Sequence, residues 1–93
     1  MPRVIVTAQV EDAAKFEQGF RTHGELFKSM TINKPIHFTV TEKNEIVGLF
    51  EPEELDKYMA VMDSRATEEA MEFDGVKRDT VKIVPLDKEF DPR

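Results

Sequence analysis

The sequence contains no cysteine and no tryptophan, and only two histidines and one tyrosine among its 93 residues. Without cysteine the chain has no disulfide framework, no thiolate metal ligand and no cysteine nucleophile. No apolar run approaches the roughly 20 residues that a membrane-spanning helix needs. The first residues, Met1-Pro2-Arg3, do not open an apolar segment of the kind found in signal peptides. We therefore expect a cytoplasmic protein that does not enter a membrane.

Positive charge is also scarce. Thirteen Lys and Arg residues stand against 19 Asp and Glu residues, a net charge of −6, and the isoelectric point is about 4.9. This balance argues against nucleic acid or anionic lipid as a partner, because both attract a basic surface. Apolar residues make up 40% and charged residues 34% of the chain, as in a folded domain. The length predicts one domain over residues 1–93, in which residues 86–93 form a charged tail.

Two hydrophobic periods alternate along the chain. Period-two alternation rich in β-branched residues predicts strands over residues 4–10, 36–41, 46–50 and 80–84. Period 3.6 predicts helices over about residues 13–30, from residue 52, and over about residues 65–72, with Asp12 and Ser64 as N-caps. Gly19 and Gly24 weaken the first helix, so that helix either packs closely against a neighbour or breaks near Gly24.

The resulting order, β-α-β-β-α-β, predicts an α+β, ferredoxin-like fold: a four-stranded antiparallel sheet with the helices on one face. Period two also sorts the strand residues into two sets. One set is apolar apart from a glycine, and we expect the helices to cover it: Val4, Val6, Ala8, Val10, Ile36, Phe38, Val40, Ile46, Gly48, Phe50, Val81 and Ile83. The other set is mixed: Ile5, Thr7, Gln9, His37, Thr39, Val47, Leu49, Lys82 and Val84. It contains too many aliphatic residues for a face left in water, so we predict a homodimer joined sheet to sheet, closing a barrel.

This pattern resembles the dimeric α/β-barrel superfamily, whose members include stress-responsive A/B-barrel proteins, antibiotic-biosynthesis monooxygenases, small polyketide cyclases and muconolactone isomerases. The resemblance spans Val4 to Pro85. It rests on the element order, on His23 late in the first helix, and on the segments 59–64 (MAVMDS), 69–71 (EAM) and 74–76 (DGV). It implies a dimer with a ligand cavity between the helices and the sheet of each subunit. The monooxygenases of this group use tryptophan and asparagine in that cavity. This chain has no tryptophan, and Asn33 and Asn44 lie in predicted turns, which argues against that chemistry.

His23 is the candidate catalytic residue. It shares a helical stripe with aromatic residues, so we expect it to point at the sheet, where an imidazole acts as a general acid or base near neutral pH. The alternative is a core histidine bonded to a backbone carbonyl or a hydroxyl. The cavity that we expect around it would accept an apolar or aromatic small molecule and is lined by Phe16, Phe20, Phe27, Phe38, Tyr58, Met59 and Met62.

Tyr58 and the methionines have competing interpretations. In the polyketide cyclases of the superfamily a tyrosine and a histidine in the cavity do acid–base work, and the resemblance places these roles loosely on Tyr58 and His23. A tyrosine at the flank of a helix with its hydroxyl in water is the alternative. A methionine stripe lines an adaptable cavity or simply fills the core.

His37 falls on the opposite face of the sheet, so the sheet separates it from His23. We expect it in the dimer interface, together with Thr7, Gln9, Thr39, Leu49, Lys82 and Phe90. Phe90 is the one large apolar residue of the charged tail, and we expect it to anchor the tail on the partner subunit.

Acidic residues cluster at residues 51–56 and 68–74, and we interpret both clusters as solvated faces, with Arg65 and Glu69 paired at helical spacing. No EF-hand, HExxH or glycine-rich phosphate motif is present, so we expect no metal and no cofactor. Two functions follow: a small-molecule-binding protein, cyclase- or isomerase-like and acting through His23, or a non-catalytic structural or regulatory homodimer. A haem protein with His23 as axial ligand is a weaker third.

Overall fold

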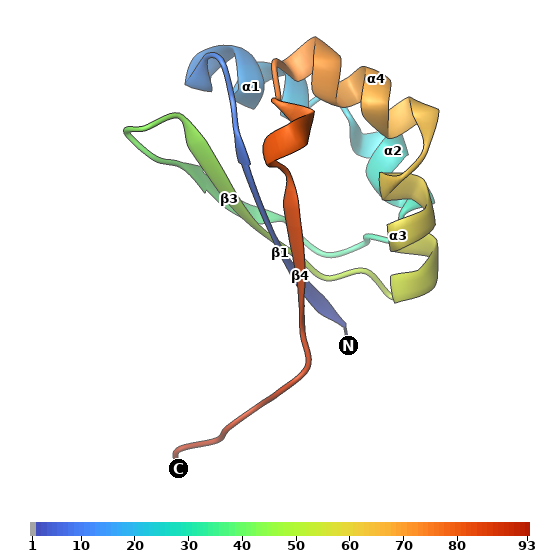
Figure 1. Cartoon of the computed structure of the whole chain (residues 1–93). Helices are drawn as coiled ribbons and strands as arrows, with labels where there is room; N and C mark the ends of the chain where they lie inside the picture. The colour runs from blue at the N-terminus through green and yellow to red at the C-terminus, as the bar shows by residue number, and fades with distance from the viewer. Residues whose placement is uncertain (1) are drawn as a thin grey trace.

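The computed structural model describes residues 2–93 and confirms the predicted α+β architecture. The strands are β1 (Arg3–Gln9), β2 (His37–Val40), β3 (Glu45–Phe50) and β4 (Lys82–Leu86). They form one antiparallel sheet in the order β2-β3-β1-β4, and the helices lie on one side of it (Figure 1). The predicted strand bounds agree with the observed ones to within two residues. No helix within residues 2–93 has both the length and the apolar character needed to cross a membrane.

The register of the sheet confirms the predicted sorting of residues. Val6 lies opposite Gly48 on β3 and Ile83 on β4, and Phe38 lies opposite Gly48 from the other side. We call the helix-covered side, which carries this row, the covered face. Gly48 is buried there because the Phe50 ring occupies the space above it: an added Cβ would lie 2.9 Å from a ring carbon of Phe50.

The other side, here called the open face, presents two rows of side chains. One row runs His37, Leu49, Ile5 and Val84, and the next runs Thr39, Val47, Thr7 and Lys82. His37, Thr39, Lys82 and Val84 are exposed, whereas the side chains on the two central strands are half-buried. The centre of the open face is therefore aliphatic and its two edges are mainly polar.

The first predicted helix is two helices, α1 (Ala13–Phe20) and α2 (Gly24–Ser29). The prediction of an unbroken helix is wrong, and the alternative of a break near Gly24 is confirmed. The hydroxyl and the amide of Thr22 both bond the carbonyl of Gly19, which closes a tight turn in place of the next helical turn. Asp12 caps α1 as predicted, and its side chain accepts the N–H groups of residues 14 and 15.

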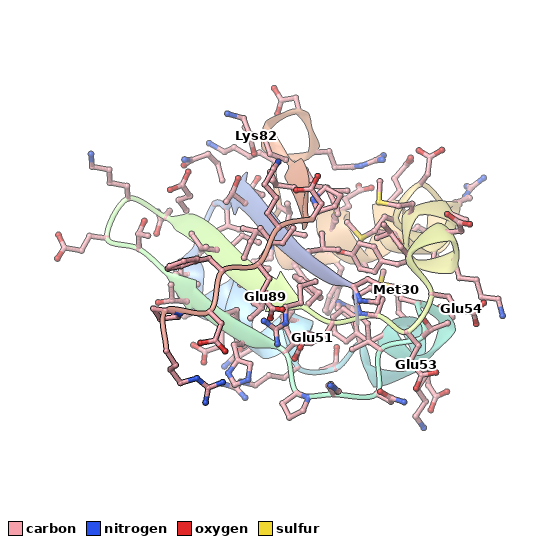
Figure 2. The ribbon with its side chains drawn as sticks, turned by 90° about the horizontal axis from the view of Figure 1, so that it is seen from below. Met30, Glu51, Glu53, Glu54, Lys82 and Glu89 are labelled. Carbon is pink, nitrogen blue, oxygen red and sulfur yellow. The ribbon has the colours of Figure 1, made fainter. Side chains whose placement is uncertain are left out.

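The second predicted helix begins later than expected. It is α3 (Leu55–Met62) and does not start at Pro52, which is buried and forms a β-bridge with Ile32. The amides of Glu53 and Glu54 bond Thr31 instead of entering the helix. Figure 2 shows Glu53, Glu54 and Met30 together where α2 meets α3, away from Lys82.

α4 (Arg65–Asp74) follows at once and is capped by Ser64, as predicted. Arg65 pairs with Glu69, also as predicted. Gly75 ends α4 with φ 75°, a left-handed conformation that glycine adopts without a steric penalty. A short 3₁₀ helix, η1 (Arg78–Thr80), leads into β4, which explains why β4 starts after the predicted Thr80.

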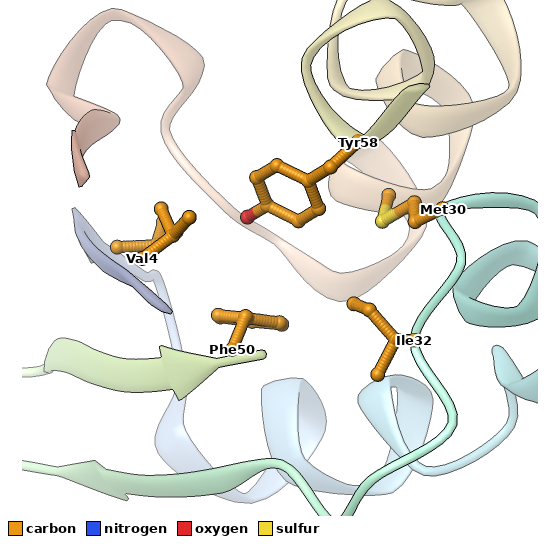
Figure 3. Packing of buried hydrophobic residues seen from close by; sticks show 6 residues of the cluster. Val4, Met30, Ile32, Phe50 and Tyr58 are labelled. Carbon is orange, nitrogen blue, oxygen red and sulfur yellow. The ribbon is translucent and has the colours of Figure 1, made fainter. Parts of the chain in front are cut away.

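The core lies between the covered face and α2–α3. Its buried members form one cluster: Val4, Val6, Met30, Ile32, Phe50 and Tyr58. Figure 3 shows the Tyr58 ring among them, with its hydroxyl directed toward Val4. The alternative of a water-exposed Tyr58 is therefore wrong: Tyr58 is 0% exposed because α3 turns this side of the helix onto the sheet.

The tail leaves the body of the protein after β4 (Figure 1). Phe90 is 85% exposed there and lies among charged neighbours. Its predicted contact with a partner subunit stays a prediction.

Candidate functional site

His23 lies in the break between α1 and α2, and its ring meets Asp74 at the end of α4. The His23 Nε2 atom is 3.1 Å from Oδ1 and 3.0 Å from Oδ2 of Asp74. The two side chains are 18% and 4% exposed. His23 therefore points at α4 rather than straight at the sheet, because the turn after Phe20 takes it out of the continuous helical stripe. Its partner is a carboxylate rather than the backbone carbonyl or hydroxyl of the alternative interpretation.

Asp74 is the residue that the sequence analysis placed wrongly. It belongs to the second acidic cluster, interpreted as solvated, but it is only 3% exposed. Helical spacing carries the missed signal: Thr67, Met71 and Asp74 recur at intervals of four and three, on the side of α4 that faces inward. The other acidic residues of that helix, Glu68, Glu69 and Glu72, are exposed as expected.

Gly19 makes room for this carboxylate. α1 packs against α4 there, and a Cβ on Gly19 would overlap the Oδ1 atom of Asp74 and lie 2.9 Å from its Cγ. The weak helix former identified in the sequence is thus explained by a close approach.

The environment of the pair decides how its proton is held. Burial raises the pKa of Asp74 above its usual range, and the hydrogen bond and positive charge offered by His23, with a smaller contribution from Lys15, offset part of that rise. An ionised Asp74 accepts a hydrogen bond only, so the His23 Nε2 atom carries the proton and donates it. That tautomer leaves the Nδ1 atom of His23 as the basic nitrogen.

The pair forms part of the wall of an inner cavity of about 60 Å³ between the helices and the covered face. Apart from His23, Asp74 and Thr67 the lining is apolar. The predicted lining residues that the structure places there are Phe16, Phe20, Phe27 and Met62.

Three predicted lining residues lie elsewhere. Phe38 packs on the outer side of Phe16 and Phe20, with the Arg21 guanidinium 5.7 Å from its ring centre. Tyr58 is enclosed in the core beside Phe50. Met59 is 39% exposed and faces a groove on the surface.

The residues proposed for a dimer interface lie on the open face or in the tail. Thr7, Gln9 and Leu49 are half-buried, and His37, Thr39 and Lys82 are exposed. The sheet separates His37 from His23, as predicted, so the two histidines belong to different sites.

A haem does not fit the inner cavity. A porphyrin is far larger than about 60 Å³, and the Nε2 atom of His23 is already engaged by Asp74. Among residues 2–93, no cluster of three or more His, Asp or Glu side chains is arranged to hold a metal ion.

Comparison with solved structures places the fold. A structure described as a putative antibiotic biosynthesis monooxygenase from Bordetella bronchiseptica superposes with a TM-score of 0.72 at 16% identity, covering 96% of this chain and 97% of that one. SnoaB, a cofactor-independent oxygenase from Streptomyces nogalater, gives 0.65 at 12% identity over 99% and 97%. A dimeric ferredoxin-like protein from an uncultured marine organism gives 0.58 at 13% identity over 99% and 92%.

The chain has the fold of the dimeric ferredoxin-like α/β proteins. The superfamily suspected from the sequence is thus matched in topology. No family model matches the sequence, and no curated protein matches it. At these identities the likeness establishes the fold, and the activity must be argued from the site itself.

Proposed function

We propose that this ferredoxin-like protein binds a small molecule between its helices and sheet and acts on it without a cofactor, with His23 as the acid–base group. The reaction class is a cyclisation or an isomerisation. One observation carries the proposal: a largely buried His–Asp pair, 3.0 Å apart, forms part of the wall of an otherwise apolar cavity.

The chemistry follows from the tautomer. Asp74 holds Nε2–H, so Nδ1 of His23 removes a proton from a C–H group next to a substrate carbonyl, and the resulting imidazolium is stabilised by the carboxylate. Return of that proton at another carbon completes an isomerisation. Attack of the enolate carbon on a second carbonyl, followed by loss of water, completes a ring closure. General base catalysis of this kind contributes about 10²–10⁴-fold in rate.

The proposal is tested by deuterium exchange into phenylacetone, a small aryl ketone with acidic C–H groups, followed by proton NMR in D₂O. We expect the wild type to accelerate exchange and His23→Gln to lose at least about 100-fold of that acceleration. Asp74→Asn should lose part of it, because the amide no longer fixes the tautomer. His37→Gln is the matched control on the open face and should exchange as the wild type does. Equal rates in the wild type and His23→Gln would overturn the proposal.

Two other functions are favoured by single observations. The small inner cavity favours a non-catalytic homodimer, which would show no exchange with any carbonyl compound tested. The neighbours described as oxygenases favour oxygenation of a deprotonated substrate, which an oxygen electrode would detect as uptake dependent on His23. Asn33 and Asn44, the only asparagines, both lie outside the cavity lining. Since the monooxygenases of the resembled superfamily use asparagine in the cavity, we favour acid–base chemistry over oxygenation.

We also propose that two copies join through the open face, as the dimeric relatives suggest. The aliphatic centre bordered by His37, Thr39 and Lys82 has the anatomy of an interface, with an apolar core and a polar rim. Native mass spectrometry should report a dimer, and Leu49→Lys should give a monomer.

Deletion of residues 87–93 should weaken the dimer through the loss of Phe90, and an unchanged dimer affinity would show that the tail is not an anchor.

A further inference from the structure

A groove of about 380 Å³ runs along the outer side of the molecule where α3 and α4 meet the start of β4. Its lining consists of Met59, Met62, Asp63, Met71, Arg78, Val81 and Ile83. Three of these residues, Met62, Met71 and Val81, also line the inner cavity beside His23. The groove and the cavity therefore share a wall, and two of its three side chains are methionines.

Methionine is suited to a movable wall. It is unbranched and has several rotatable bonds, so it takes up new positions at little energetic cost, unlike leucine or valine. Met62 and Met71, which we call the methionine wall, are both only partly buried, so groove space lies on one side of them and cavity on the other.

Size gives the reason for such movement. Pockets that hold small organic molecules measure about 300–1,000 Å³, and the inner cavity of about 60 Å³ is well below this range. The groove alone is within it. Swinging the methionine wall aside would join the two into one site with His23 and Asp74 at its inner end.

A competing route from the other side is closed. A hollow lined by Lys15, Gln18, Gly19, Thr22 and Phe73 lies outside the contact of α1 with α4, but none of these residues lines the cavity. The backbone of Gly19 stands directly against the Asp74 carboxylate there. Movement on that side would require the two helices to separate.

We propose that the methionine wall is the gate of the His23 site: a ligand binds in the groove, displaces Met62 and Met71, and reaches His23 from the β4 side. This inference rests on the proposed function and specifies how its site opens. The groove floor is apolar, and its polar residues are Asp63 and Arg78, the latter already paired with Glu68 at 2.5 Å. Since five of the seven lining residues are apolar, the ligand is an elongated, mainly apolar, uncharged molecule with one polar end.

The experiment uses N-phenyl-1-naphthylamine, a neutral fluorescent molecule of this shape, and protein carrying ¹³C-labelled methionine methyl groups. We expect saturable binding that shifts the Met62 and Met71 methyl signals and the ring signals of His23. Met62→Leu/Met71→Leu conserves volume but stiffens the wall, so affinity should fall at least about fivefold. Leu55→Met is the control: Leu55 lies on the same helix as Met62 but lines neither the groove nor the cavity, so this variant should bind within about twofold of the wild type.

Each other result overturns the gate. Binding by the double variant equal to that of the wild type, or shifts at Met62 and Met71 that never reach His23, would mean that groove and cavity do not join. Failure of the gate is distinguishable from failure of the proposed chemistry: deuterium exchange that is lost in His23→Gln, with probe binding unaffected by the double variant, removes only the gate.

Discussion

The two faces of the sheet are built from the same strands, but they meet different surroundings. On the covered face, Val4, Val6 and Phe50 are buried under the helices, and Val6 and Phe50 line the cavity beside the His23–Asp74 pair. On the open face, Ile5, Val47 and Leu49 alternate with them along the same strands and stay half-exposed. Alternation alone thus produces two apolar surfaces, and only one of them finds its cover within this chain.

The difference separates stability from assembly. The covered face is packed under helices of the same chain, so its side chains contribute to the free energy of unfolding at any concentration. In the proposed dimer the open face is buried by a second molecule, and its side chains then contribute a concentration-dependent part. Adjacent residues of one strand can test this because they point in opposite directions.

The largest expected effect comes from Phe50 on the covered face. Phe50→Ala should lower the free energy of unfolding by about 3–5 kcal/mol, because it removes a ring packed against Tyr58 and Phe27 and leaves a cavity. Denaturant titration measures this loss, and it should not depend on protein concentration.

Leu49→Ala is the matched change, one residue away and on the other face. We expect it to cost under about 1.5 kcal/mol in dilute protein and more at concentrations where the wild type is dimeric. Equal losses for both variants at every concentration would remove the distinction between the faces.

The regular spacing of apolar residues made most of the fold predictable from the sequence. The β-branched alternation of residues 4–10 assigns each residue of β1 to its face without knowledge of any contact. The caps at Asp12 and Ser64 were also readable, since each is a short polar side chain before an apolar helical pattern.

The candidate site was less predictable because its members are distant in the sequence and depend on tertiary packing. His23 stood out as a polar residue in an aromatic stripe. Asp74 looked like one acidic residue among several, because only the packing of α4 against α1 buries it. Tyr58 presented the opposite problem: its hydroxyl suggested a wet position, and only the packing of α3 on the sheet buries it.

Gly19 and Gly24 lie on the helices that pack over the covered face, and they allow the same substitution to be compared at a close contact and at an open position. Gly19→Ala should cost about 1–3 kcal/mol, because the new methyl group overlaps the Asp74 carboxylate and α1 must move. Gly24→Ala adds the same group with no atom within 4 Å, and helix propensity should make it neutral or stabilising by up to about 1 kcal/mol. Thermal unfolding distinguishes them, and a Gly19 variant as stable as the Gly24 variant would mean that α1 does not press on Asp74.

Tyr58→Phe tests the polar atom inside the core of the covered face. The hydroxyl is buried without a hydrogen-bond partner among residues 2–93, and burial raises its pKa, so it stays protonated. Its removal eliminates an unpaired polar group, and we expect stability to rise by up to about 1 kcal/mol in denaturant titrations. A loss of more than about 1 kcal/mol would show that the hydroxyl has a stabilising partner after all.

Asp74 gives the smallest effect and the most specific one, a dependence on pH. Burial raises the pKa of Asp74 in the folded protein, so the carboxyl holds its proton more tightly than in the unfolded chain. Its contribution to stability is therefore complete below its ordinary value of about 3.8 and is lost as the pH rises through the raised folded value. The stability of the wild type relative to Asp74→Asn should accordingly fall as the pH is raised from about 3 to 7, measured by urea unfolding at each pH. A rise over the same interval would mean that the hydrogen bond and charge of His23 outweigh the effect of burial on the pKa of Asp74.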